Sequence, residues 1–206
     1  MVKIKVCGIR DKEGAIACEQ NQVDFVGFNF VIGRRRAISI QQAIALQPFC
    51  PTPQSVGVFF NQSVEVITNV LDEFPLDFVQ LHGSESIQLC QQVSQRAKII
   101  KAFSIDKNFD ESALHPYQDY VSFWLFDAPS AGEGKRFDWT LIQDLKTKTP
   151  YWLAGGLNPE NVVEAIQKFS PYAVDTASGV EVKGEQCPQR IATLCQAVRD
   201  TNETRR

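Results

Sequence analysis

Short apolar runs alternate with amphipathic stretches along the whole chain. Runs rich in β-branched and aromatic residues predict buried strands, which lie at residues 4–7, 25–30, 55–60, 78–81, 99–103, 121–126, 151–153 and 173–175. Apolar residues at helical spacing predict the helices, which lie at residues 12–20, 40–46, 63–73, 85–94, 139–145, 162–166 and 189–199. The stretch 104–120 is polar, contains Pro116 and has weak periodicity, so its helix is expected to be degenerate. Residues 201–206 are expected to be frayed.

Eight strand-then-helix units predict parallel strands with helices on the outside. A doubly wound open sheet is the alternative architecture. The barrel is favoured because the count reaches eight and because polar candidates stand at the ends of several strands: Cys7, His82, Asp127 and Asp175. In a (β/α)8 barrel the carboxyl ends of all strands face one opening, where active sites lie. We therefore predict a compact, single-domain (β/α)8 TIM barrel of class α/β that spans residues 1–206.

Length and composition agree with a small barrel. The chain has 206 residues, 44% of them apolar, whereas about 250 residues is typical of this fold. Its 21 basic and 24 acidic residues leave a net charge of −3, which gives no general attraction to nucleic acid or to anionic membranes. An apolar signal segment and long apolar runs are missing from the sequence, so a cytoplasmic location is expected. Six scattered cysteines and two histidines show no metal-ligand spacing, and no metal is expected.

Two turns rich in small residues follow the last two predicted strands. They are Ala154-Gly155-Gly156 and Thr176-Ala177-Ser178-Gly179. Small residues let a ligand approach the backbone, and N–H groups without partners bind phosphate. A Gly-Gly pair by itself is more often only a tight turn, but two such turns at neighbouring strand ends are typical of the phosphate site of these barrels. The predicted phosphate-binding residues are Gly155, Gly156, Ser178 and Gly179.

Four motifs resemble those of the phosphoribosylanthranilate isomerases, a family of tryptophan biosynthesis. They are Val6-Cys7-Gly8-Ile9-Arg10, Phe78-Val79-Gln80-Leu81-His82-Gly83-Ser84-Glu85, Leu153-Ala154-Gly155-Gly156-Leu157, and the turn from Val174-Asp175 to Ser178-Gly179-Val180-Glu181. Further matches are Gly57-Val58-Phe59 and Phe137-Asp138-Trp139. Each motif alone is moderately specific, but their order and spacing cover nearly the whole chain.

The resemblance implies a (β/α)8 barrel that needs no cofactor, acts on a small phosphosugar, and is a monomer or a homodimer. The implied reaction is the Amadori rearrangement of N-(5-phospho-β-D-ribosyl)anthranilate to 1-(2-carboxyphenylamino)-1-deoxy-D-ribulose 5-phosphate. It requires an acid that protonates the ring oxygen as the sugar opens to a Schiff base. It also requires a base that then removes the C2′ proton.

Cys7 and Asp127 match the proton-transfer residues of the family. Cys7 would be the general base, and a positively polarised mouth is expected to stabilise its thiolate. A cysteine chosen at random is more often a buried packing residue, but the position before Gly8 at a strand end, with the match, favours catalysis. Asp127 would be the general acid, with a pKa raised by burial behind Leu125 and Phe126. A helix cap is its alternative role, but a long loop follows it.

Three more residues are implied to lie against the substrate. Arg36 matches the arginine whose planar fork faces the anthranilate carboxylate. His82 is implied to be close to the substrate without transferring the proton. Asp175 is expected to orient substrate hydroxyls or to hold Arg36.

The chain departs from the family pattern in three loops. Arg34 and Arg35 replace the usual Ser-Pro, and we interpret them as a solvated basic loop. Ala131-Gly132-Glu133-Gly134 replaces Gly-Gly-Thr-Gly, so a contact through the threonine side chain is lost. Gly184-Glu185-Gln186-Cys187 replaces Gly-x-Lys-Asp, which removes electrostatic help from that loop.

Two other functions compete with this one. A related barrel performs the same rearrangement on the aminoaldose of histidine biosynthesis. It usually carries aspartates at the ends of the first and fifth strands, where this chain has Cys7 and Phe103-Ser104. A catalytically silent phosphate-binding barrel would be expected to lose Cys7 or Asp127, and both are present.

Overall fold

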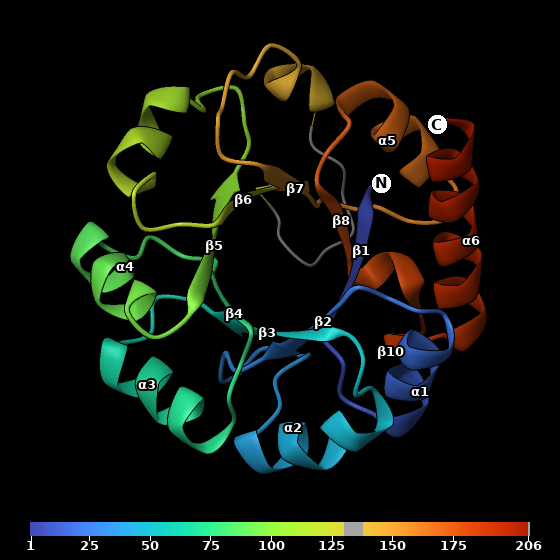
Figure 1. Cartoon of the computed structure of the whole chain (residues 1–206), viewed down its shortest axis with the longest axis horizontal. Helices are drawn as coiled ribbons and strands as arrows, with labels where there is room; N and C mark the ends of the chain where they lie inside the picture. Colours follow the sequence, from blue (N-terminus) through green and yellow to red (C-terminus); the bar gives the residue numbers. More distant parts are fainter. Residues whose placement is uncertain (130–137, 206) are drawn as a thin grey trace.

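The computed structural model describes residues 1–129 and 138–205. Its parallel strands form a closed barrel in which each strand pairs with the next and the last pairs with the first (Figure 1). The strands are β1 (Lys3–Cys7), β2 (Phe25–Asn29), β3 (Gln54–Phe59), β4 (Phe78–Leu81), β5 (Lys98–Ser104), β6 (Phe123–Asp127), β7 (Tyr151–Leu153) and β8 (Ala173–Thr176). The predicted barrel is confirmed, and the open sheet is wrong.

Helices surround the barrel in the order that the sequence predicts. They are α1 (Lys12–Gln20), α2 (Ile40–Leu46), α3 (Val64–Glu73), α4 (Ile87–Ser94), α5 (Val162–Phe169) and α6 (Pro188–Thr204). The first four begin after Asp11, Ser39, Ser63 and Ser86, and each of these side chains accepts a hydrogen bond from the backbone N–H three residues later. Such caps satisfy N–H groups that the helix itself leaves unpaired.

The sequence and the structure differ most between β5 and β7. The expected degenerate helix is present as the 3₁₀ helix η2 (Glu111–Tyr117), which contains Pro116. The helix predicted at residues 139–145 is wrong, because only the short 3₁₀ helix η3 (Trp139–Ile142) forms there. Its few apolar residues, chiefly Trp139 and Ile142, bury themselves within a single turn.

The carboxyl-terminal segment is also better ordered than expected. Helix α6 continues to Thr204, and Thr201 is buried. The Asn202 side chain exchanges two hydrogen bonds with the backbone of Val2, at 2.7 and 3.0 Å. The expected fraying is therefore wrong for the described part of this segment, because contacts with Val2, just before the first strand, hold it.

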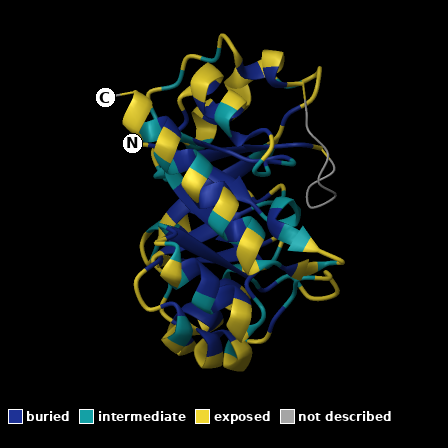
Figure 2. Ribbon diagram, turned by 90° about the vertical axis from the view of Figure 1, so that its right-hand side faces the viewer, coloured by how far each residue is buried: buried dark blue, intermediate teal, exposed yellow. Residues whose placement is uncertain are grey.

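Apolar side chains form two separate clusters. One lies between the strands and the helices, and Figure 2 shows it as a buried layer beneath helices whose outer faces are exposed. The other fills the barrel: Phe25 of β2 contacts Phe78 of β4 and Trp152 of β7, with ring centroids 5.7 and 4.6 Å apart. Strands so far apart around the ring can touch only through its interior. The lower barrel is thus a packed core, and open space is confined to its ends.

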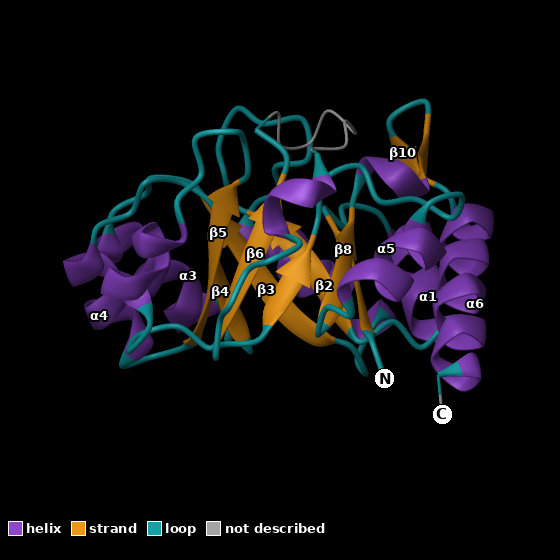
Figure 3. Ribbon diagram, turned by 90° about the horizontal axis from the view of Figure 1, so that it is seen from above, coloured by secondary structure: helices purple, strands orange, loops and turns teal. Residues whose placement is uncertain are grey.

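The end of the barrel to which the strands point carries an additional hairpin. It follows the 3₁₀ helix η4 (Ser178–Val180) and consists of β9 (Glu181–Val182) and β10 (Glu185–Gln186). Figure 3 shows the hairpin projecting on this side, whereas both chain termini lie on the opposite side. Among the described helices, none is long and apolar enough to cross a membrane.

Candidate active site

A cavity of about 330 Å³ opens at the carboxyl ends of the strands. This volume is at the lower end of the range of small-molecule sites. All of the predicted site residues except Gly179 line it, namely Cys7, Arg36, His82, Asp127, Gly155, Gly156, Asp175 and Ser178. These residues come from β1, β6 and β8 and from the segments after β2, β4, β7 and β8, and they meet there only because the barrel is closed.

The order of the strands decides where each group stands around this mouth. Asp127 ends β6, the small-residue turns follow β7 and β8, Cys7 ends β1, and Arg36 lies in the loop after β2. The two phosphate turns therefore stand between the predicted acid and the predicted base. A ligand anchored at these turns would have Asp127 on one side and Cys7 on the other.

Cys7 stands above a buried ion pair that the sequence did not single out. Lys5, two residues earlier on β1, donates from Nζ to both carboxylate oxygens of Asp175, each at 2.9 Å. Burial raises the pKa of the Cys7 thiol; Lys5 and Arg36 act against this rise and Asp175 adds to it. The positive charge at the mouth acts in the expected direction, but the loss of solvation outweighs it, so the pKa of the thiol is raised.

Asp127 is buried at the mouth and contacts His82. Its Oδ2 lies 3.2 Å from His82 Nε2, and its Oδ1 accepts a hydrogen bond from the backbone N–H of Ala128 at 2.7 Å. The Gln80 side chain lies behind the imidazole, with its Nε2 2.8 Å from His82 Nδ1. With the amide nitrogen as donor, Nδ1 accepts, and Nε2 lies near Asp127 without forming a hydrogen bond among the described residues.

Arg36 is held in a two-pronged contact with Glu181. Its Nε donates to Oε1 at 2.6 Å, and its Nη2 donates to Oε2 at 2.9 Å. Asp175 was expected as a possible partner of Arg36, but this expectation is wrong, because the carboxylate of Asp175 is bonded to Lys5 instead. Among the described residues, Nη1 of Arg36 has no acceptor, so the second edge of the guanidinium is free for a ligand carboxylate.

Arg34 and Arg35 are exposed, as the predicted solvated loop requires, but both also make contacts that the sequence did not predict. Arg35 donates to Glu181 Oε2 and to the backbone oxygen of Gly184, both at 2.5 Å, and Arg34 lies over the ring of Phe60. Both arginines line the cavity. Arg35 thus brings positive charge against the hairpin, in which Glu185-Gln186 replaces the usual lysine position. The Glu133 departure lies outside the described residues.

The two predicted phosphate turns lie against each other. Gly155 and Gly156 have φ values of 84° and 66°, which favour glycine. The Thr176 hydroxyl donates to the backbone oxygen of Leu157 at 2.7 Å, and a Cβ on Gly179 would lie only 1.8 Å from that oxygen. Gly179 therefore serves this close packing and does not line the cavity.

The position of the free N–H groups differs in part from the expectation. Helix α5 begins at Val162, several residues after Gly156, and does not start at the glycines. At the second turn η4 does begin at Ser178, directly after the strand end. Among the described residues, the N–H groups of Gly155, Gly156 and Ser178 have no backbone acceptor. The anion-binding capacity of the mouth therefore comes from the turns themselves.

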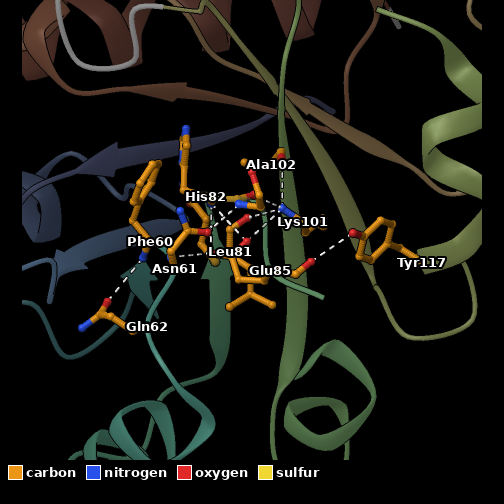
Figure 4. Close-up of polar contacts among 12 residues, drawn as sticks. Phe60, Asn61, Gln62, Leu81, His82, Glu85, Lys101, Ala102 and Tyr117 are labelled. Carbon is orange, nitrogen blue, oxygen red and sulfur yellow. Dashed lines mark hydrogen bonds and ion pairs between the residues drawn. The ribbon is translucent and has the colours of Figure 1, made fainter. Parts of the chain in front are cut away.

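A buried network fixes the loop that carries His82 (Figure 4). Lys101 of β5 donates to Glu85 at 3.0 Å and to the backbone oxygens of Leu81, Gly83 and Ala102, at 3.3, 2.6 and 3.2 Å. Glu85 in turn accepts hydrogen bonds from backbone N–H groups, including that of Gly83 at 2.9 Å. The contacts of Lys101 with Leu81, Gly83 and Glu85 tie the backbone on either side of His82 to the neighbouring strand.

Sequence reasoning missed three residues of the site: Lys5, Gln80 and Glu181. Lys5 and Gln80 each stand two residues before a candidate, in an otherwise apolar strand. Because side chains two apart share a face of a strand, this spacing is a signal that could have found both. Glu181 had no such signal, since its contact with Arg36 crosses 145 positions of the chain.

The described residues show no group of three or more histidine, cysteine and acidic side chains that could hold a metal ion. The groups that line the cavity can transfer protons and bind anions. A thiol and a carboxyl group face one cavity, with an arginine and two small-residue turns between and beside them. This arrangement can bind a phosphorylated carboxylate and move protons on it.

Known proteins share this sequence and fold. A family model described as N-(5'phosphoribosyl)anthranilate (PRA) isomerase matches residues 4–197. An N-(5'-phosphoribosyl)anthranilate isomerase of Listeria monocytogenes is 39% identical over 194 residues, which cover 91% of this chain and 94% of the relative. The crystal structure of phosphoribosyl anthranilate isomerase from Thermotoga maritima has a TM-score of 0.89 at 34% identity, covering 97% of this chain and 100% of that one. A crystal structure of such an isomerase in complex with reduced 1-(o-carboxyphenylamino)-1-deoxyribulose 5-phosphate has a TM-score of 0.85 at 35% identity, with 97% and 100% covered.

Proposed function

The chain belongs to the N-(5'-phosphoribosyl)anthranilate isomerase family, and we propose that it performs the family's Amadori rearrangement with Cys7 as base and Asp127 as acid. It is an isomerase of tryptophan biosynthesis that converts N-(5-phospho-β-D-ribosyl)anthranilate to 1-(2-carboxyphenylamino)-1-deoxy-D-ribulose 5-phosphate. The observation that carries the proposed roles is that a thiol, a carboxyl group, an arginine and two anion-binding turns line one cavity.

The two ends of the substrate are proposed to bind on either side of Cys7. The phosphate would accept hydrogen bonds from the turns after β7 and β8, through Gly155, Gly156 and Ser178, with Gly179 packing the turns together. The anthranilate carboxylate would bind the Nη1–Nη2 edge of Arg36, whose other edge Glu181 occupies. This assignment places the sugar across the mouth between the turns after β7 and β8 and the loop after β2, beside Cys7.

Asp127 is proposed to start the reaction. In its protonated form it would donate a proton to the ring oxygen as the furanose opens to the Schiff base. His82 Nε2, 3.2 Å from Asp127 Oδ2, would orient the carboxyl group, and Gln80 would orient His82. After this step Asp127 is a carboxylate, and the imidazole ring of His82 lies next to it.

Cys7 is proposed to complete the reaction. Its thiolate would remove the C2′ proton, and the electrons of that C–H bond would flow to the iminium nitrogen and give an enolamine. The enolamine then tautomerises to the ketone product. Asp175, bonded to Lys5 at the rim of the same cavity, would contact substrate hydroxyls.

Growth complementation tests the function. The gene is expected to restore growth without tryptophan to a bacterial strain that lacks this isomerase, and the Cys7→Ser variant is expected not to. The purified protein should also convert the substrate in a fluorescence assay of the anthranilate ring. A well-expressed, folded protein that neither rescues growth nor shows turnover would contradict the proposal.

Hydrogen exchange tests the phosphate site separately. Inorganic phosphate is expected to slow exchange at the N–H groups of Gly155, Gly156 and Ser178, because it would occupy acceptor positions that are empty in the free turns. Protection elsewhere with none at these turns would show that the phosphate binds at another place. The cytoplasmic location, the single domain and the monomeric or homodimeric state stay predictions from the sequence.

A further inference from the structure

Lys5 is fully buried inside the barrel, and the proposed proton transfers do not use it. Its relative exposure is 0%, and its place on β1 puts it on the same face as Cys7, one step deeper. Asp175 is its direct neighbour in the pairing of β1 with β8. A buried lysine is costly unless it is paired, and Asp175 supplies the pair through two hydrogen bonds of 2.9 Å.

The Lys5 side chain lies beside the Cys7 thiol. A Cβ added to Gly27 of β2 would lie 2.7 Å from Cys7 Sγ and 3.2 Å from Lys5 Cε, so both side chains lie over the same glycine. Each of the two groups shifts the pKa of the other, as expected of close neighbours. Asp175 takes two of the three ammonium hydrogens, and the third is left for sulfur.

Few other charges of the described residues face the thiol. Arg36 approaches it from the loop after β2, but Glu181 of β9 neutralises much of this charge through its two hydrogen bonds. From β10, only the neutral Gln186 approaches, and its amide donates to the backbone oxygen of Cys7 at 3.5 Å. Across the mouth, Asp127 acts to raise and His82 acts to lower the pKa of Asp175, and neither is a main influence on the thiol. Lys5 is therefore the cation placed best to favour a negative charge on sulfur.

The directions of the pKa shifts agree with this placement. Burial acts to lower the pKa of Lys5, but Asp175 and Cys7 outweigh it, and the pKa is raised. Lys5 thus stays an ammonium while Cys7 loses and regains its proton. Among the nearby charges, Lys5 lowers the pKa of the thiol more strongly than Asp175 raises it.

We infer that Lys5 is the counter-ion of the Cys7 thiolate, and that Asp175 and the thiolate share its ammonium group. This positioning role rests on the proposed function, in which Cys7 is the base. When Cys7 is a thiol, Asp175 holds the ammonium in place. When Cys7 is a thiolate, the ammonium lies ready beside it, so the charge forms without rearrangement of the site.

Alkylation of Cys7 by iodoacetamide as a function of pH tests the inference without using turnover, because only the thiolate reacts. The other partly exposed cysteine, Cys187, is first replaced by serine, and peptide mass spectrometry confirms the modified position. The double variant Lys5→Met/Asp175→Asn removes the pair without leaving a lone buried charge. Its alkylation rate near neutral pH should be at least about tenfold lower, the change that one pKa unit makes.

A second variant tests the direction of the shift in the midpoint pH of alkylation, and a third is the control. Asp175→Asn alone should speed alkylation and lower its midpoint pH, because the thiolate becomes the sole counter-ion of Lys5. The matched control Lys101→Met/Glu85→Gln removes the other buried lysine pair and should leave the midpoint where it is in the parent. An unchanged midpoint in the Lys5 double variant would overturn the inference. If that variant does not fold, Asp175→Asn decides, and a midpoint that does not fall overturns it.

Failure of the inference and failure of the proposed function give different results. If Cys7→Ser retains full activity while the midpoints move as expected, Lys5 controls the thiol but the thiol is not the base. If Cys7→Ser is inactive while the midpoints do not move, Cys7 is the base and its thiolate is stabilised by another group.

Discussion

Two of the described lysines are buried in this barrel, each beside one carboxylate, yet their surroundings differ. Lys101 of β5 contacts Glu85 and three backbone oxygens, which is more than its three hydrogens need. Among the described oxygen acceptors, Lys5 of β1 contacts only the carboxylate of Asp175, and the thiol of Cys7 lies beside it over Gly27. All three ammonium hydrogens of Lys101 therefore bind acceptors that hold the fold together. Lys5 keeps one hydrogen for the Cys7 thiol, which changes its charge during the proposed reaction.

The comparison separates two uses of the same ion pair. Around Lys101, the network locks the loop between Leu81 and Glu85 in one geometry, and this indirectly positions His82 (Figure 4). Around Lys5, the pair is an electrostatic device next to the reacting sulfur. A buried pair whose donors are saturated by backbone is thus expected to matter for stability, and an unsaturated pair that faces a cavity is expected to matter for chemistry.

The largest expected effect is on the Lys5 side, where Cys7→Ser should lower kcat by about 10²- to 10⁴-fold. A serine hydroxyl has nearly the volume of the thiol, but it does not ionise near neutral pH. The unfolding midpoint in urea should stay close to that of the parent, since no charge is buried or exposed. Near-normal turnover would show that Cys7 is not the base and that Lys5 has no role in the reaction through it.

Asp127→Asn should show the same kinetic signature from the other side of the mouth. The amide keeps the shape of the carboxyl group but has no acidic proton to donate to the ring oxygen, so the loss should fall on kcat with little change in KM. Steady-state kinetics measures both constants. An unchanged kcat with a raised KM would reduce Asp127 to a binding residue.

On the Lys101 side, the expected loss is in stability. Lys101→Met leaves Glu85 buried without its cation and should lower the free energy of unfolding by about 3 to 5 kcal/mol. Urea denaturation followed by tryptophan fluorescence measures this loss. Lys107→Met, at an exposed lysine, is the control and should change stability by less than about 0.5 kcal/mol. Equal stability of the two variants would show that the saturated network is dispensable.

The contrast between the two lysines also shows how far the sequence alone could lead. Continuous apolar runs marked the strands, and chemically reactive residues at strand ends, such as Cys7 and Asp127, marked the mouth. The pairing of Lys5 with Asp175 spans 170 positions and depends on closure of β1 against β8, which no local pattern contains. The region around Trp139 was mispredicted because helical spacing of a few apolar residues does not fix the length of a helix.

A third charged contact, at the rim of the mouth, should have a smaller effect. Arg36→Ala is expected to cost about 1.5 to 3 kcal/mol in substrate binding, seen as a rise in KM that exceeds the fall in kcat. Its guanidinium would grip the anthranilate carboxylate in the ground state and the transition state alike. A substrate analogue without the carboxylate should bind the parent and the variant equally well. If the parent bound this analogue more tightly than the variant does, the substrate carboxylate would have to bind at another residue.

The smallest expected effect is the pH dependence of the contact that holds Arg36 in place. Burial acts to raise the pKa of Glu181, but hydrogen bonds from Arg36 and Arg35 outweigh it, and the pKa is lowered. A carboxyl group with a lowered pKa in the folded state binds protons more weakly there than in the unfolded chain. Its contribution to stability is therefore complete above the ordinary pKa of a glutamate and is lost as the pH falls through the lowered value.

Glu181→Gln should remove this part of the acid dependence. The parent should lose unfolding free energy more steeply than the variant as the pH falls below the ordinary pKa of glutamate, and the two curves should run parallel at neutral pH. Urea denaturation at a series of acidic pH values measures the difference, and Glu185→Gln, at an exposed position of the same hairpin, is the matched control. Parallel curves over the whole acidic range would mean that Glu181 is not held by the arginines in solution. Arg36 would then be as free as a surface arginine, and the rim would lack the fixed geometry that the two buried pairs have.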